Sequence, residues 1–284
     1  MRLRSLAACV LAIGAAVSAH AQWINNPVTG IPMKDGKPDL SAPTPRTAKG
    51  KPDLSGVWTT DSTSAEEMKK LFPGIDVLTV PGDNPLALPK FFLNVFADYK
   101  PQDVPMTPRG AQIFKQRISE GVSKEVPTSH CLPAGIPMGD LLPAPRRIIQ
   151  LPGLIVVLYD GINPQRMIYI DGRKHPVDPL PTWMGYSVGT WNGDTLVVDT
   201  RGFTDRSWLD GMGHPRTEAM HIVERITRRD VGHLDVEVTF EDSGAYTKPF
   251  SIRYSSTLRP NLDILEGVCN ENEKDRAHIN AAQP

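Results

Sequence analysis

The sequence predicts a mainly β fold: an antiparallel up-and-down barrel or strongly curled sheet, preceded by a Pro-rich N-terminal arm with short helices. From residue 131 onward, short strand-like runs are separated by Asp-Gly, Asn-Gly and Val-Gly turn signals. No stretch between those runs is long enough to form the helix that a parallel crossover needs. Apolar and polar residues alternate over 235–240, which is typical of a sheet with one solvent-facing side.

About eight or nine strands are expected, and the closest architecture is calycin-like (lipocalin-type), with a sandwich as the alternative. Small closed barrels hold one ligand inside or at the mouth. The run 54–58 is expected to be the first strand of the folded part. The other expected strands cover residues 147–151, 154–159, 165–170, 186–191, 195–200, 218–227, 234–241, 250–258 and 264–269.

Three segments are expected along the chain. Residues 1–21 are typical of a secretory signal: Arg2 and Arg4 precede an apolar run too short to span a bilayer, and a small-residue cleavage site comes before Gln22. The mature protein is therefore expected in the periplasm or outside the cell. Residues 22–130 are expected to form the arm and pack on the barrel, which takes up residues 131–284.

Two helices in the arm have recognisable starts. Ser64 is a capping residue ahead of two glutamates, and Thr107-Pro108 places a proline at the first helical position. The apolar stretch 88–99 is assigned to helix, although it could equally cover a barrel mouth or bind a partner.

The charge balance limits the classes of binding partner that the chain is expected to have. The chain has 31 basic and 32 acidic residues, so removal of Arg2 and Arg4 leaves 29 − 32 = −3. Binding to nucleic acid or to an anionic membrane needs clustered Lys and Arg, which this chain lacks. No later apolar run is long enough for a membrane span. The expected partner is a small-molecule ligand or substrate, and the oligomeric state stays open.

Two cysteines, Cys131 and Cys269, remain after the signal. In an oxidising compartment two cysteines without a third suggest one disulfide, which is the expectation here. The alternative is that one of them is a catalytic thiolate.

The clearest hairpin surrounds Asn192-Gly193, a dipeptide that favours a two-residue type I′ turn. With that turn the register places Tyr186 opposite Asp199. The polar loop 201–215 follows, and a loop of that length is usually functional or disordered. Its apolar residues argue for order, so we expect an ordered lid over one end of the sheet.

The lid and its flanks hold the densest group of ionisable residues. We expect His214 to form a proton-transfer pair with Asp199 or Glu218, because a carboxylate can orient an imidazole that titrates near neutrality. Tyr186 on the neighbouring strand would join them. Substrate contacts are expected from Arg206, Trp183, Trp208 and Asp210. The alternative is that these residues are structural: the His214 imidazole would hydrogen-bond to backbone groups, and the aspartates would form turns through their own side-chain hydrogen bonds.

No metal and no cofactor are expected. His214, Glu218 and His221 are of metal-ligand types, but on a strand residues 218 and 221 face opposite sides. The chain lacks H-E-x-x-H, a P-loop, a dinucleotide fingerprint and a haem-attachment motif. The acidic run 270–276 has residue types that could bind calcium, but it lacks the glycine and the spacing of an EF-hand loop. We therefore expect a solvated helical tail capped by Asn270.

Several motifs resemble those of a group of exported bacterial proteins of unassigned function. They are DLSGVW at 53–58, WMGYSVGTWNGDTLVV at 183–198, Gly213-His214-Pro215 with Glu218, and CNENEKDR at 269–276. The likeness covers about 50–60 and most of 128–280. It implies export, and it carries over no activity and no catalytic roles.

Two functions from different classes are therefore expected. The first is an exported, cofactor-independent enzyme that uses the His, carboxylate and Tyr cluster for acid–base chemistry on a small, partly apolar molecule in a barrel cavity, as a lyase, isomerase or hydrolase. The alternative is a non-catalytic, lipocalin-like carrier of a small ligand. The ionisable cluster favours the enzyme, because a carrier of apolar ligands would avoid burying such groups. A structural or envelope-assembly role is the remaining possibility.

Overall fold

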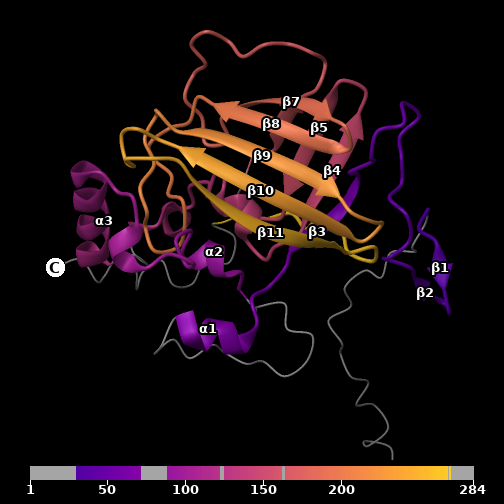
Figure 1. Cartoon of the computed structure of the whole chain (residues 1–284), viewed down its shortest axis with the longest axis horizontal. Coiled ribbons are helices and arrows are strands. Elements are labelled where there is room, and N and C mark those ends of the chain that lie inside the picture. Colours follow the sequence, from indigo (N-terminus) through magenta and orange to yellow (C-terminus); the bar gives the residue numbers. More distant parts are fainter. Residues whose placement is uncertain (1–29, 72–87, 122–124, 162–163, 268, 270–284) are drawn as a thin grey trace, which may run out of the picture.

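A computed structural model describes residues 30–71, 88–121, 125–161, 164–267 and 269. The expected signal peptide at 1–21 and the run 270–276 lie outside the described residues. Within the described part the fold is mainly β, as predicted, and nine strands form one closed barrel (Figure 1).

The barrel strands follow one another around the wall in chain order, and the first pairs with the last to close it. They are β3 Gly56–Thr60, β4 Arg146–Leu151, β5 Leu154–Tyr159, β6 Arg166–Tyr169, β7 Tyr186–Asn192, β8 Thr195–Arg201, β9 His221–Arg228, β10 His233–Glu241 and β11 Phe250–Leu258. Because β3 precedes residue 131, the region expected as an arm supplies one strand of the barrel.

Strands β6 and β7 are the one parallel pair among the nine, with Ile168 beside Ser187. The reason is geometric: strand direction must alternate between antiparallel neighbours, so an odd number of strands cannot close without a parallel pair. The connection 170–185 therefore has to return the chain to the barrel end at which β6 began. It is the long loop above β7 in Figure 1.

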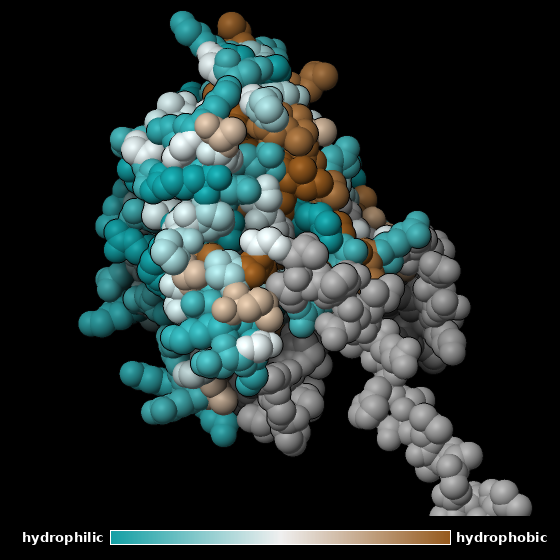
Figure 2. Space-filling model, turned by 90° about the vertical axis from the view of Figure 1, so that its right-hand side faces the viewer, coloured by the Kyte–Doolittle hydropathy of each residue, from teal (hydrophilic) through white to brown (hydrophobic). Residues whose placement is uncertain are grey.

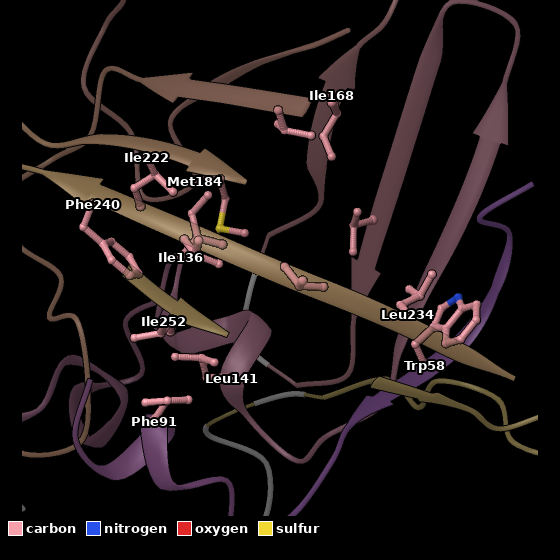
Figure 3. Packing of buried hydrophobic residues seen from close by; sticks show 14 of the residues in the cluster. Trp58, Phe91, Ile136, Leu141, Ile168, Met184, Ile222, Leu234, Phe240 and Ile252 are labelled. Atoms are coloured by element: carbon pink, nitrogen blue, oxygen red, sulfur yellow. The ribbon is translucent and has the colours of Figure 1, made fainter. Parts of the chain in front are cut away.

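Side chains alternate between the barrel interior and the outer wall, as in β8, where Leu196, Val198 and Thr200 are buried and their neighbours are not. Inward side chains pack with residues from the connections and helices below the barrel, among them Ile136, Leu141 and Phe91 (Figure 3). Burial of an aliphatic or aromatic side chain of this size contributes about 1.5–3 kcal/mol, so this one core holds the barrel and its covering segments together.

The β7–β8 hairpin has a different register from the predicted one. Asn192 pairs with Thr195, so the two central turn residues are Gly193 and Asp194. Gly193 has φ +61° and the φ of Asp194 is not positive, which fits a type II′ turn with glycine first rather than type I′. Tyr186 consequently lies opposite Arg201 and Asp199 opposite Val188, so the predicted pairing of Tyr186 with Asp199 is wrong.

The remaining elements are short. They are the strands β1 Met33–Lys34 and β2 Lys37–Pro38, the helices α1 Ala65–Leu71, α2 Lys90–Leu93, α3 Pro108–Glu120 and α5 Met138–Leu141, and the 3₁₀ turns η1 Pro101–Asp103 and η2 Pro127–His130. Thr107 caps α3 as predicted, since its hydroxyl accepts the N–H of Gly110 at 3.0 Å.

Three predicted elements need correction. The stretch 88–99 is helical only over α2, because Asn94 is already extended. Strand β9 begins at His221, since a turn joins the carbonyl of Thr217 to the N–H of Met220. Residues 264–267 form no strand: β3 already occupies the free edge of β11, so the closed barrel has no place for another.

Different segments cover the two barrel ends. At one end Arg228 donates to the carbonyls of Asp53, Ser55 and Val231, and its guanidinium lies 4.9 Å from the Trp58 ring centroid. The other end is closed by residues 131–142 and by the connection between β8 and β9. This connection contains most of the predicted lid, and because β8 ends at Arg201 and β9 begins at His221, the lid in the structure is residues 202–220.

Cys131 and Cys269 form a disulfide, as predicted, with their Cα atoms 5.6 Å apart. The bond fixes the chain that follows β11 to the segment that closes the lid end. Among the described helices, none has the length and apolar character needed to cross a bilayer.

Candidate functional site

The lid is ordered and packs into the core. Phe203 and Leu209 are fully buried, and Trp208 is 4% exposed. Arg216, itself 2% exposed, donates to the carbonyls of Thr204, Ile136 and Trp183 and so joins three connections. This guanidinium clamp holds the lid closed.

His214 and Asp210 form a pair inside the lid, with Nδ1 of the histidine 2.5 Å from Oδ2 of the aspartate. The Asp210 carboxylate also accepts backbone N–H bonds from Val95, Met212, Gly213 and His214 at 2.8–3.1 Å. It is completely buried. A carboxylate that accepts so many donors organises the turn around it.

The His214 imidazole is enclosed by aromatic rings. It stacks on Phe114 at 4.2 Å between ring centroids and meets the edge of Phe96 at 4.9 Å. Its side chain is 4% exposed, which leaves almost no surface for a substrate. His214 therefore joins the lid to α3 and to the turn that follows α2. It does not contact Asp199, whose partners are different residues.

Asp199 lies on the outer wall of the barrel, because β8 turns its even-numbered residues inward. His175 from the β6–β7 connection approaches its Oδ1 to 3.0 Å through Nε2, and His221 at the start of β9 approaches Oδ2 to 3.1 Å. Arg201 donates from Nε at 3.1 Å. The other ring nitrogen of His221, Nδ1, is 3.5 Å from a carboxylate oxygen of Glu241. We call these five residues the Asp199 cluster.

Burial works to raise the pKa of the Asp199 carboxyl, but the contacts with Arg201 and His221 outweigh it and hold that pKa below its usual value. The two imidazoles lie close to the carboxylate without the alignment of a normal hydrogen bond, and the buried Nε2 atoms of both have no other hydrogen-bond partner in the described residues. Close contacts, rather than aligned hydrogen bonds, join the two histidines to Asp199.

A cleft of about 290 Å³ opens beside the Asp199 cluster. Its lining includes His221, Arg201 and Glu218 together with Asp178, Pro179 and Phe203. Glu218 is exposed and Arg201 is half-exposed, so charged groups of both signs are available to a molecule in this cleft. Its volume is close to the lower limit of small-molecule sites, about 300 Å³. We call it the His221 cleft.

The other predicted site residues are spread around the lid. The Tyr186 ring stacks on Tyr169, and its hydroxyl accepts a bond from Arg173 at 3.4 Å. The Arg206 guanidinium lies 5.3 Å from the Trp183 ring centroid. Trp208 is buried beneath Arg117, and Asp210 is the buried partner of His214. Of the eight, only Glu218 lines the His221 cleft. Asp199 lies behind the lining and contacts two of its residues, His221 and Arg201.

A second ionisable group, which the sequence analysis missed, lies inside the barrel. Arg166 donates through both terminal nitrogens to Glu224 and through one of them to Asp140 at 3.4 Å. Tyr159 donates to Asp140 at 2.9 Å, and burial, reinforced by the charge of Asp140, raises the pKa of Tyr159 well above its usual value. Arg146 completes the network through Thr60, Ser256 and the Asp140 carbonyl. Each buried charge thus has partners.

A cavity of about 30 Å³ lies between this network and the apolar side chains of the opposite barrel end. It is large enough for a water molecule or two, and far below the roughly 300–1,000 Å³ of a small-molecule site. Among the residues that the structure describes, inward side chains fill the barrel around this cavity, which is too small for a ligand.

Within the described residues, no group of three or more His, Cys, Asp or Glu side chains is arranged to hold a metal ion. His175 was missed as a site residue, because its contact with Asp199 bridges the sequence between two distant segments. His221 had been considered only as a metal ligand. The alternation in β9 could have identified Glu224, since it faces inward together with Ile222.

Comparison with family models, with curated proteins and with solved structures gave no match for this chain.

Proposed function

We propose that the His221 cleft is the active site of an acid–base enzyme, a lyase, isomerase or hydrolase, that acts on a small polar molecule. One observation carries the proposal: an imidazole at the cleft wall lies between two carboxylates, with a guanidinium alongside. Such a group can take up a proton, stabilise the resulting imidazolium and return the proton.

The roles follow from which atoms reach the cleft. Nε2 of His221 is buried 3.1 Å from a carboxylate oxygen of Asp199, and this negative charge favours a proton on that nitrogen. Nδ1 is then the basic atom, and the exposed Glu241 beside it can move away for a substrate. Nδ1 would take a proton from a substrate C–H or from water, and Asp199 would stabilise the imidazolium that forms.

Two further groups complete the site. Arg201 donates to Asp199 through Nε at 3.1 Å and through Nη2 at 3.5 Å. Its side chain is half-exposed, and Nη1 can donate to an oxyanion that develops on the substrate. Glu218, on the same cleft wall, supplies a second carboxylate for proton return. His175 orients Asp199 from behind and does not line the cleft.

The proposed site lies on the outer wall of the barrel, whereas the sequence predicted a site in the barrel cavity. A partly apolar substrate inside the barrel would need a cavity many times larger than 30 Å³. The cleft wall is rich in charged side chains, so a small polar substrate is favoured. The carrier alternative has no comparable observation in its favour.

Turnover of a panel of small esters, lactones and hydroxy or keto acids tests the proposal, with the wild-type chain compared with His221→Asn and Asp199→Asn. We expect each variant to lower kcat/KM by about 10²–10⁴-fold. The matched control is His233→Asn, since His233 also pairs with an aspartate, Asp230 at 2.7 Å, but lies away from the cleft. Panel compounds that bind without any turnover, or equal activity in all variants, would contradict it.

A further inference from the structure

Four arginine side chains among the described residues are almost fully buried, and they differ in how their charge is balanced. Arg146 and Arg166 both lie within 4.0 Å of carboxylate oxygens of the buried Asp140. Arg216 and Arg228, at opposite ends of the barrel, have no carboxylate oxygen that close in the part of the chain that the structure describes. A buried guanidinium without a counter-charge is costly, so the surroundings of these two residues are of interest.

Arg228 is held in place by backbone carbonyls. Its Nε donates to the carbonyl of Asp230 at 3.1 Å, and its terminal nitrogens donate to the carbonyls of Asp53, Ser55 and Val231. Burial lowers the pKa of this guanidinium to about 10, although the charges of Asp53 and Asp230 act in the opposite direction. The side chain is therefore charged at neutral pH, fixed in position, and without a bonded carboxylate.

Arg228 lines a cleft of about 620 Å³, which is within the range of small-molecule sites. We call it the Arg228 cleft. The β1–β2 hairpin, which follows the lining residue Ile31, lies at the right of Figure 1, and Figure 2 faces that side of the molecule. Figure 2 shows hydrophobic surface directly beside hydrophilic surface there. The apolar part of the cleft lining includes Ile31, Val57, Ile149, Leu258 and Leu262.

The charged part of the cleft lining has a positive balance, with three guanidinium groups and two carboxylates. Arg147 and Asp263 are bonded to each other at 2.5 Å and balance one another. Arg259 is exposed and donates from Nε to Thr59 at 2.8 Å, which leaves its terminal nitrogens without a partner among the described residues. Two guanidinium groups therefore face a single remaining carboxylate, that of Asp53, and one positive charge is left over.

We propose that the Arg228 cleft binds a small organic acid that carries one carboxylate on an apolar body. The carboxylate would accept hydrogen bonds from the terminal nitrogens of Arg259, whose planar fork matches the two oxygens, and the buried charge of Arg228 would attract it. A phosphate monoester is a poorer fit, because its charge of about −2 exceeds the one positive charge left over. The Arg228 cleft shares no lining residue with the His221 cleft, so this binding does not depend on the proposed enzymatic function.

Isothermal titration calorimetry of the full chain tests the proposal with 1-naphthylacetate and its neutral amide, which have nearly the same shape and differ in charge. We expect the acid to bind at least about tenfold more tightly than the amide. Arg259→Gln should reduce that preference to less than about threefold, because it removes the hydrogen-bond donors and the charge. Arg253→Gln is the matched control: it removes an exposed arginine of β11 that does not line the cleft, and should keep the preference. Circular dichroism checks that both variants are folded.

Equal affinity for the acid and the amide, or no binding of either, would overturn the proposal. Equal loss in Arg253→Gln and Arg259→Gln would also overturn it, since the preference would then come from the general charge of the surface. If Arg201→Gln removes the preference and Arg259→Gln does not, the acid binds at the His221 cleft instead. Tighter binding of 1-naphthyl phosphate than of the acid would contradict the proposed ligand class. None of these measurements uses turnover, so a failure of the proposed enzymatic function would leave their outcome unchanged.

Discussion

Two histidine–aspartate pairs in this barrel protein have the same chemistry and opposite surroundings. His214 and Asp210 are buried under the lid between aromatic rings, and the carboxylate there accepts a ring of backbone N–H groups. His221 and Asp199 lie on the outer wall, where the imidazole lines a cleft. The comparison teaches that access, and not the pair of residue types, separates a structural clamp from a possible active site.

Removing the buried carboxylate should give the largest change in stability. Asp210→Ala would leave the N–H groups of Val95, Met212 and His214 without their carboxylate acceptor. We expect a loss of about 3–5 kcal/mol in the free energy of unfolding, measured by urea denaturation. Asp230→Ala, which removes the partly exposed partner of His233, is the control and should cost about 1 kcal/mol. Equal losses in the two variants would remove the distinction between buried and exposed pairs.

Replacing the buried imidazole should cost less, because aromatic packing around it partly remains. We expect His214→Leu to lose about 1–3 kcal/mol of stability, since one oxygen of Asp210 is left without its side-chain donor. Activity per folded molecule should stay close to that of the wild type. If instead His214→Leu abolishes turnover in a protein of normal stability, the buried pair is the catalytic one and the assignment is reversed.

Chemical modification compares the accessibility of His214 and His221 and needs no known substrate. Diethyl pyrocarbonate carbethoxylates accessible imidazole nitrogens, so we expect His221 to react at Nδ1 and the 4% exposed His214 to be protected. Peptide mapping by mass spectrometry should show at least about a tenfold difference in rate, since access to His214 requires local opening of the lid. Similar rates at both sites would mean that the lid opens readily.

The smallest effect concerns the pH dependence of stability. The pKa of Asp199 is lower in the folded chain than its ordinary value, so its ion pairs stabilise the fold above that value and the contribution disappears as the pH falls through the lowered pKa. We expect Asp199→Asn to cost less than about 1 kcal/mol at neutral pH, because the carboxylate is about one third exposed. Thermal unfolding of both proteins should converge in acid. A constant difference down to the lowest pH would contradict the role of the charge.

Local patterns predicted most of the barrel. The apolar run of β5 fixed its bounds, and Thr107 ahead of Pro108 located the start of α3. The hairpin register was missed because Asn192-Gly193 and Gly193-Asp194 are both acceptable two-residue turns, and the choice depends on how β7 meets the rest of the wall. Local chemistry could not decide between them.

The candidate site was predicted only in part, for a related reason. Asp199 and Glu218 were identified, but His214 was preferred to His221 because burial is a property of the packed protein and not of a motif. His175 reaches Asp199 from another connection, and no short-range pattern marks such a contact. The alternation of inward and outward residues places Arg166 and Glu224 on the inner face of their strands. That pattern does not show that they contact each other, because the contact forms only when the strands close into a barrel.

The odd number of strands in the barrel determines where His175 lies. A ring with an even number of strands can close with antiparallel pairs alone, so short turns at its rims are enough to join each strand to the next. With nine, one link must travel the height of the wall, and in this protein that link delivers His175 to the carboxylate of Asp199. Closure with an odd number of strands has thus brought a histidine to the exterior of the cylinder, where it contacts the carboxylate next to the His221 cleft.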